Sequence, residues 1–180
     1  MQYYEISPAE YPSFCFGNVD NCAPCPCGNE AASTMRGGCV NATGWSAVLS
    51  YLGRASVSDD SLQFVGFGLN PNAFAVLISG DNALPNAGAC APGSGIPSPL
   101  LDGLRCVGGN VRRHGTRMSF GSGFVEGWGL PNGPPGGLVA NGNFAAGQVR
   151  RFQLIYRQIV TAQCGTAQAT SNAVEVLIEP

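Results

Sequence analysis

The chain has 180 residues and a formal net charge of −2, with 44% hydrophobic and only 11% charged residues. A chain of this length fits one domain with a sizeable core, while its 26 glycines and 13 prolines exclude a fold of several long helices. No apolar run approaches the roughly 18 residues that a spanning helix needs, so we expect no membrane span.

Charge is unevenly distributed along the chain. Residues 1–104 contain two arginines and eight acidic residues, whereas residues 105–157 contain seven arginines and a single acid, Glu126. The pI is near 5.2 and the arginines form no groove-reading motif, so we expect no nucleic-acid partner. The opposite charges either pair within one fold, which is the simpler interpretation, or orient head-to-tail neighbours.

Residues 1–14, MQYYEISPAEYPSF, combine three tyrosines with two prolines and predict an extended segment. They contain no apolar signal core, so a secretion signal, if there is one, lies outside this numbering. An unpaired strand here can add to the edge of a neighbour's sheet, and Tyr3, Tyr4 and Ile6 are therefore candidate subunit-linking residues.

Eight cysteines predict a disulfide framework, because their number is even and the chain is rich in turns. A chain this long does not need bridges for stability, so they indicate resistance to unfolding outside the cell, and we expect an extracellular or cell-surface protein. Residues 15–44 hold five of them and few apolar side chains, which predicts a cross-linked loop region. The cysteines are Cys15, Cys22, Cys25, Cys27, Cys39, Cys90, Cys106 and Cys164.

The spacing Cys22-x-x-Cys25-x-Cys27, followed by Cys39, also allows zinc or iron–sulfur binding. A zinc site usually repeats its Cys-x-x-Cys pair, and no second pair follows. Cys22 and Cys25 also have the spacing of a redox-active dithiol, which requires a helix N-terminus to lower the thiol pKa. The residues that follow, Pro26-Cys27-Gly28, do not predict a helix. Disulfides remain the preferred interpretation, and we expect neither a metal nor a cofactor.

Residues 45–180 predict a β-sandwich, because short β-type runs alternate there with turn residues. One run, residues 149–159, also fits a helical period, but β-branched and aromatic residues favour a strand. The overall expectation is an all-β, disulfide-stapled antiparallel sandwich, Ig-like or jelly-roll-like, with loops at 80–103 and 127–147. The seven predicted strands are Trp45–Leu52, Leu62–Phe67, Ala73–Ser79, Leu104–Val107, Val111–Phe120, Val149–Ile159 and Ala173–Ile178.

No catalytic set is recognisable. His114, the only histidine, would have to serve as the base of a serine or cysteine hydrolase, but no Gly-x-Ser-x-Gly elbow occurs. A single histidine also excludes a copper site built on a histidine pair. Paired carboxylates of a glycosidase remain an alternative, and the candidates are Asp59, Asp60, Asp81, Asp102 and Glu126.

Aromatic side chains offer a route to sugar binding, because tryptophan and tyrosine rings stack on pyranose rings. Trp128 lies in a glycine-rich segment and is the candidate exposed platform, whereas Trp45, at the head of an alternating strand, is expected in the core. The sequence Asn41-Ala42-Thr43 matches a glycosylation acceptor, so Asn41 is a candidate modification site.

Several motifs resemble an uncharacterised family of exported, Cys- and Gly-rich bacterial proteins. They are FCFG at residues 14–17, CPCGN at 25–29 and GLRCVGG at 103–109, followed by a late aromatic strand and Cys164. The resemblance implies secretion and a disulfide-bonded β module, but no activity. Cys22 and Cys90 look like additions to the family pattern and are predicted to pair; Cys106 with Cys164 is the second predicted pair.

Three functions are compatible with these features. The first is an extracellular structural or adhesive protein, a subunit of a surface filament or coat that self-associates by strand addition. The second is a carbohydrate-binding module that binds a polysaccharide, and the third, ranked last, is a glycoside-active hydrolase that uses carboxylates. We expect residues 1–14, 15–44 and 45–180 to form an extended segment, a cross-linked loop region and the sandwich, respectively.

Overall fold

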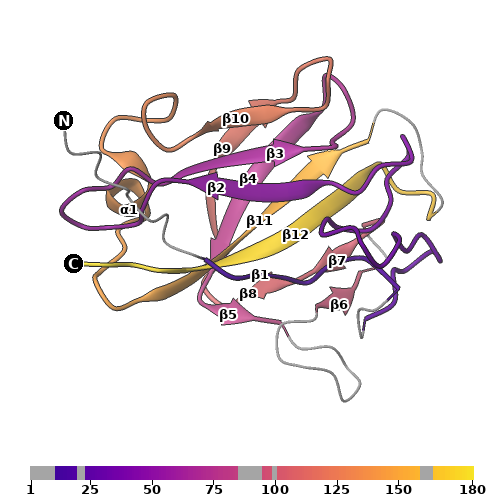
Figure 1. Ribbon diagram of the computed structural model, residues 1–180, viewed down its shortest axis with the longest axis horizontal. Coiled ribbons are helices and arrows are strands. Elements are labelled where there is room, and N and C mark those ends of the chain that lie inside the picture. The colour runs from indigo at the N-terminus through magenta and orange to yellow at the C-terminus, as the bar shows by residue number, and fades with distance from the viewer. Residues whose placement is uncertain (1–10, 20–22, 85–94, 99–100, 159–163) are drawn as a thin grey trace, which may run out of the picture.

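Two antiparallel sheets face each other in the computed structural model, which describes residues 11–19, 23–84, 95–98, 101–158 and 164–180 (Figure 1). The larger sheet has the strand order β1-β12-β11-β4-β9 and the smaller one the order β10-β3-β2. The elements are β1 Ser13–Phe14, β2 Val48–Leu52, β3 Gln63–Phe67, β4 Phe74–Gly80, β5 Asn82–Ala83, β6 Ile96–Pro97, β7 Leu104–Arg105, β8 Val107–Gly108, β9 Arg112–Met118, β10 Val125–Trp128, α1 Gly137–Gly142, β11 Val149–Arg157 and β12 Gln168–Leu177.

The predicted all-β, disulfide-bonded sandwich is confirmed, with sheets that do not close into a barrel. Two small ribbons, β5-β8 and β6-β7, lie beside the larger sheet. In the described part of the chain the six-residue α1 is the sole helix, and it is too short to cross a membrane. The three-part division of the chain stays a prediction.

The main core lies between the two sheets because their strands alternate buried and less buried side chains. Phe152, Leu154 and Tyr156 of β11 point inward and are at most 1% exposed. From the smaller sheet Phe64 meets Phe152, with ring centroids 4.6 Å apart. The preference for a strand over a helix in the run 149–159 is therefore confirmed for Val149–Arg157.

Several observed strands differ from the predicted ones in their bounds. For two of them the local structure shows the reason. The run at 104–107 is divided at Cys106 into β7 and β8, each with a different partner strand. β12 begins at Gln168, five residues before the predicted start, because its polar beginning is buried and hydrogen-bonded. Ser171 Oγ, for example, accepts a hydrogen bond from the Leu154 amide at 3.0 Å.

Side chains, and not strand pairs, connect the open edges of the two sheets. At one edge the Asn172 amide bonds the Leu49 backbone twice, accepting at 2.7 Å and donating at 3.2 Å. At the other, Trp128 Nε1 donates to the Gly115 carbonyl at 3.0 Å and Arg117 Nε donates to the Gly127 carbonyl at 2.9 Å. These bonds satisfy backbone groups that an unpaired edge would leave without partners.

A second, smaller core covers part of the outer face of the larger sheet. Here the N-terminal loop and the β7–β8 segment pack against Ile78 and Ala173, with Cys106 fully buried among them. Gln153 anchors this cover, because its Nε2 donates to the Leu104 carbonyl at 2.9 Å and its Oε1 accepts from the Cys106 amide at 3.0 Å. We call the residues of this second core, with the loop that carries them, the cross-linked cover.

Three disulfides hold the described part of the cover: Cys15–Cys106, Cys25–Cys39 and Cys27–Cys164. The predicted pair Cys106–Cys164 is wrong. Cys106 faces the sheet surface where the N-terminal loop begins, whereas Cys164 lies in the β11–β12 connection beside Cys27. Cys22 and Cys90, the other predicted pair, lie outside the described residues.

The bridges should differ in their contribution to stability. Cys27–Cys164 spans 137 residues and Cys25–Cys39 spans 14, and by the chain-entropy model they contribute about 5 and about 3 kcal/mol. We therefore expect the double variant C27S/C164S to lose more free energy of unfolding than C25S/C39S in guanidinium titrations. An equal loss, or the reverse order, would contradict the entropic origin.

Asn172→Ala removes both bonds to the Leu49 backbone and leaves a buried amide and a buried carbonyl unsatisfied. We expect the free energy of unfolding to fall by about 2–4 kcal/mol, because each orphaned group costs about 1–3 kcal/mol. Asn132→Ala, at an exposed loop position, is the matched control and should change it by less than about 0.5 kcal/mol. Urea denaturation of the two variants measures the difference. Similar losses of the free energy of unfolding would contradict a connection of the sheet edges through Asn172.

Candidate functional site

The predicted aromatic platform at Trp128 is wrong, because this side chain is 1% exposed. Trp128 is the last residue of β10, which extends two residues into the segment 127–147 expected to be a loop, and its indole packs in the main core. With its Nε1 bonded to the Gly115 carbonyl, the ring has no face left for a sugar.

Trp45, expected in the core, is instead 61% exposed. Ala47 and Leu49 are buried, so an unbroken strand would have turned Trp45 inward with them. The strand, however, begins only at Val48, and Trp45 follows a turn at Gly44. The break in the alternation places its indole on the surface.

Trp45 borders a groove with a cavity volume of about 620 Å³. Phe67 on β3 is 46% exposed, and its ring centroid lies 5.2 Å from that of Phe124. Phe120, 54% exposed, stacks on Phe124 with an angle of 11° between the rings and a centroid distance of 6.0 Å. We call this the aromatic groove; its lining residues are Thr43, Trp45, Ser46, Val48, Phe67, Gly68, Leu69, Pro71, Ser122 and Phe124.

Asn41 positions the two sides of the aromatic groove. Its backbone amide donates to the Trp45 carbonyl at 2.8 Å, and its side-chain Nδ2 donates to the Gly68 carbonyl at 2.8 Å and to the Tyr156 hydroxyl at 3.1 Å. Gly68 is needed there, because its φ is +70° and a Cβ would lie 2.8 Å from the Ser46 carbonyl oxygen.

The predicted glycosylation of Asn41 does not fit this arrangement. Asn41 is 4% exposed and its amide nitrogen donates two hydrogen bonds inside the protein. The Thr43 hydroxyl of the acceptor sequence donates to Asn41 Oδ1 at 2.6 Å, which closes a local turn. The motif that suggested a glycan is therefore a structural element of the groove wall.

The polar groups of the aromatic groove are neutral. The lining residues include no charged side chain, and their hydroxyls belong to Thr43, Ser46 and Ser122. Ser46 is 8% exposed and its Oγ has no hydrogen-bond partner within the described structure. A buried hydroxyl without a partner costs free energy, but this oxygen has almost no exposed surface, so the hydroxyls that a ligand can reach are those of the exposed Thr43 and Ser122.

His114 pairs with a serine, but not in a catalytic arrangement. Its Nε2 lies 2.8 Å from Ser79 Oγ, and its ring packs against Phe144 and Phe152. Ser79 has no exposed surface and also accepts a hydrogen bond from Arg150 at 3.4 Å. A substrate cannot reach this hydroxyl, so the pair is a buried structural contact.

Three of the predicted acid–base carboxylates lie in separate hydrogen-bond networks. Asp60 accepts from the Val139 amide at 2.6 Å, and its burial raises the carboxyl pKa. The Asp81 carboxylate accepts hydrogen bonds from the backbone and side chain of Asn110, and these bonds lower the pKa of Asp81. Asp102 is buried and accepts hydrogen bonds from Gln158 and Thr166. None of these networks brings together the facing pair that glycoside hydrolysis needs.

The cysteines form no thiolate site in the described residues. Cys27 and Cys164 lie with Asp102 in a group whose ligand-type atoms are within 4.8 Å of one another. The two sulfurs are bonded to each other, so they cannot bind metal as thiolates. The candidate linking residues Tyr3, Tyr4 and Ile6 lie outside the described residues.

Sequence reasoning missed the phenylalanines of the aromatic groove, although a signal was present. Phe67, Phe120 and Phe124 each adjoin a glycine where a strand ends or a turn begins. Aromatic–glycine pairs at strand ends are therefore candidate positions for exposed rings in this chain. The chain matches no protein-family model, no curated protein and no solved structure.

His114 should make stability depend on pH. Burial, and then the nearby Arg150 and Arg112, lower the pKa of His114 from 6.5 to about 4 in the folded state. Between these values the unfolded chain binds the proton more readily, so the stabilising contribution is complete above pH 6.5 and is lost as the pH falls toward 4.

We expect this group alone to lower the free energy of unfolding by about 3 kcal/mol between pH 7 and pH 4. The His114→Gln variant keeps every other titratable group of the protein but has no imidazole. Its free energy of unfolding should therefore change less with pH than that of the wild type. Urea titrations of both proteins across this range provide the measurement. Parallel profiles would show that His114 does not titrate as its burial requires.

Proposed function

We propose that this protein is an extracellular adhesive module that binds a neutral polysaccharide in the aromatic groove. The observation that carries the proposal is that Trp45 and Phe67, each about half exposed or more, line this groove, and that the exposed Phe120 ring extends it by stacking on the lining residue Phe124. Exposed aromatic faces stack well on the apolar faces of pyranose rings.

The chemistry of the groove supports a particular class of glycan. Its lining has no charged residue, so an anionic polymer would find no counter-charge there. The exposed hydroxyls of Thr43 and Ser122 can exchange hydrogen bonds with sugar hydroxyls. A neutral β-linked glycan, whose rings present flat faces in a row, is therefore the preferred ligand.

The disulfides support the location. Three bridges in the described residues join segments 14, 91 and 137 positions apart, and such frameworks persist in oxidising compartments. This framework is compatible with the exported character that the sequence motifs imply.

Pull-down on insoluble glycans tests the proposal. We expect the wild type to be retained on microcrystalline cellulose or chitin, and Trp45→Ala or Phe67→Ala to bind about tenfold more weakly, equivalent to about 1.4 kcal/mol. The matched control is Leu177→Ala, because Leu177 is 49% exposed and lines neither of the two grooves on the surface. This variant should bind like the wild type.

Two outcomes would overturn the assignment. One is failure of the wild type to be retained on any neutral glycan. The other is retention that Trp45→Ala and Leu177→Ala weaken to the same extent, which would indicate non-specific adsorption. Thermal denaturation of each variant checks that the fold is intact, because all three side chains are exposed and their removal should cost little stability.

A further inference from the structure

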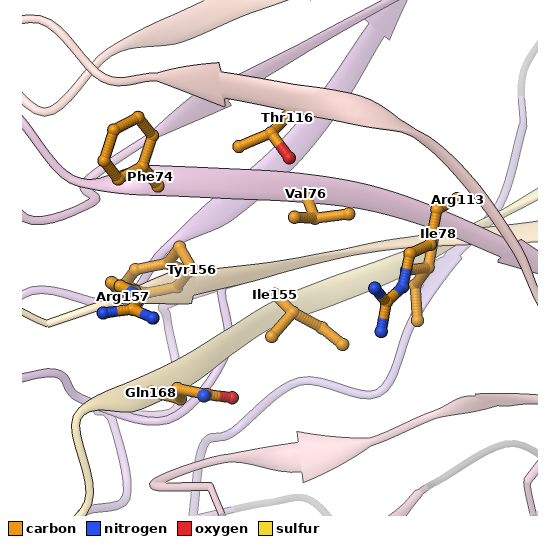
Figure 2. Close-up of a pocket in the computed structure, with 9 residues that line it drawn as sticks. All are labelled: Phe74, Val76, Ile78, Arg113, Thr116, Ile155, Tyr156, Arg157 and Gln168. Atoms are coloured by element: carbon orange, nitrogen blue, oxygen red, sulfur yellow. The ribbon is translucent and has the colours of Figure 1, made fainter.

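A second groove lies on the outer face of the larger sheet, where the cross-linked cover ends. Its floor is apolar: Val76 and Ile155 are half-buried and Phe74 is 56% exposed. Its cavity volume is about 610 Å³. Figure 2 shows Arg113 and Arg157 at opposite ends, with Val76 and Ile155 between them. We call this the arginine groove.

The two arginines of this groove have no acidic partner among the described residues. The ion pairs in that part of the chain use Arg54 and Arg151 instead. Two exposed guanidinium groups beside an apolar floor favour an occupant that carries acidic groups and apolar side chains.

Strand register gives the spacing that such an occupant must match. Arg113 pairs with Ile78, and Arg157 follows Tyr156, which pairs with Ala75. The arginines are thus four residues apart along β4 and two strand spacings apart across the sheet, or about 16 Å between their Cα atoms. An extended peptide spans that length with about five residues.

The chain itself contains such a peptide. Residues 1–10, MQYYEISPAE, carry acids at Glu5 and Glu10, which are five positions apart, and no basic side chain. Ile6 and Pro8 lie between the acids, and two tyrosines precede them. The charge, the apolar character and the spacing of this segment all complement the arginine groove.

Geometry favours the segment of a neighbouring copy over a copy's own segment. The chain enters β1 beside the Leu177 end of β12, where Tyr11 is buried and bonded to Tyr51 and Ala55. The arginine groove lies at the opposite end of β12, where Gln168 is one of its lining residues. A copy's own Tyr11 therefore lies at the far end of β12 from its own arginine groove.

We propose that the arginine groove binds residues 1–10 of a second copy and so links copies head to tail. Because the donating and accepting surfaces differ, the contact is heterologous, and each added copy presents a further free segment and a further free groove until a ring closes. This self-association is independent of the polysaccharide proposed for the aromatic groove, since the two grooves share no lining residue.

Charge reversal tests the proposal on the full chain by sedimentation velocity over a concentration series. We expect the wild type to form larger species that dissociate in high salt, and R113E/R157E and E5R/E10R each to remain monomeric. The variant that combines all four reversals should assemble again. Phe67→Ala, in the aromatic groove, is the control and should assemble like the wild type.

A labelled peptide of residues 1–10 gives a second readout that does not require assembly. It should bind the E5R/E10R chain, whose groove is left open, and bind at least tenfold more weakly when R113E/R157E are added. Equal affinities, a monomeric wild type at every concentration, or failure of the four-reversal variant to assemble would each overturn the proposal. Loss of glycan binding in these variants would not, because that concerns the other groove.

Discussion

Buried side-chain amides are the constraint on which this structure depends. The sandwich has two sheets that do not share a strand, so their open edges and the loops beside them need hydrogen-bond partners from elsewhere. Asn172 supplies these hydrogen bonds at one edge of the sandwich. Gln153 supplies them between the larger sheet and its cover, and Asn41 supplies them between the two walls of the aromatic groove. Each amide both donates and accepts, which lets one side chain replace a missing piece of strand pairing.

The covalent framework complements these bonds and determines which surface stays open. Bridges from Cys15 and Cys27 fix the N-terminal loop on the outer face of the larger sheet, at Cys106 and at Cys164. The cover occupies the region around Ile78 and Ala173 but does not reach Phe74. The floor of the arginine groove lies at the border of this cover, where Val76 and Ile155 pack against it and Phe74 stays exposed.

The two grooves have opposite chemistry and lie on different elements. The aromatic groove is uncharged and is built from the loop before β2, the end of β3 and the turn before β10. The arginine groove is built on β4, β9, β11 and β12. A protein that binds a glycan with one surface and a second copy with the other can form a cross-linked adhesive layer. Glycan binding and self-association would then serve the same adhesive function.

The sequence by itself determined the class of this protein: alternating residues such as Phe152, Leu154 and Tyr156 predicted strands, and the cysteine count predicted a bridged framework. Local alternation is a property of neighbouring residues, so a single sequence contains it. Disulfide partners, the burial of Trp128 and the exposure of Trp45 depended on contacts between distant segments. Only the tertiary structure decided them, because a ring is buried or exposed according to what another part of the chain places over it.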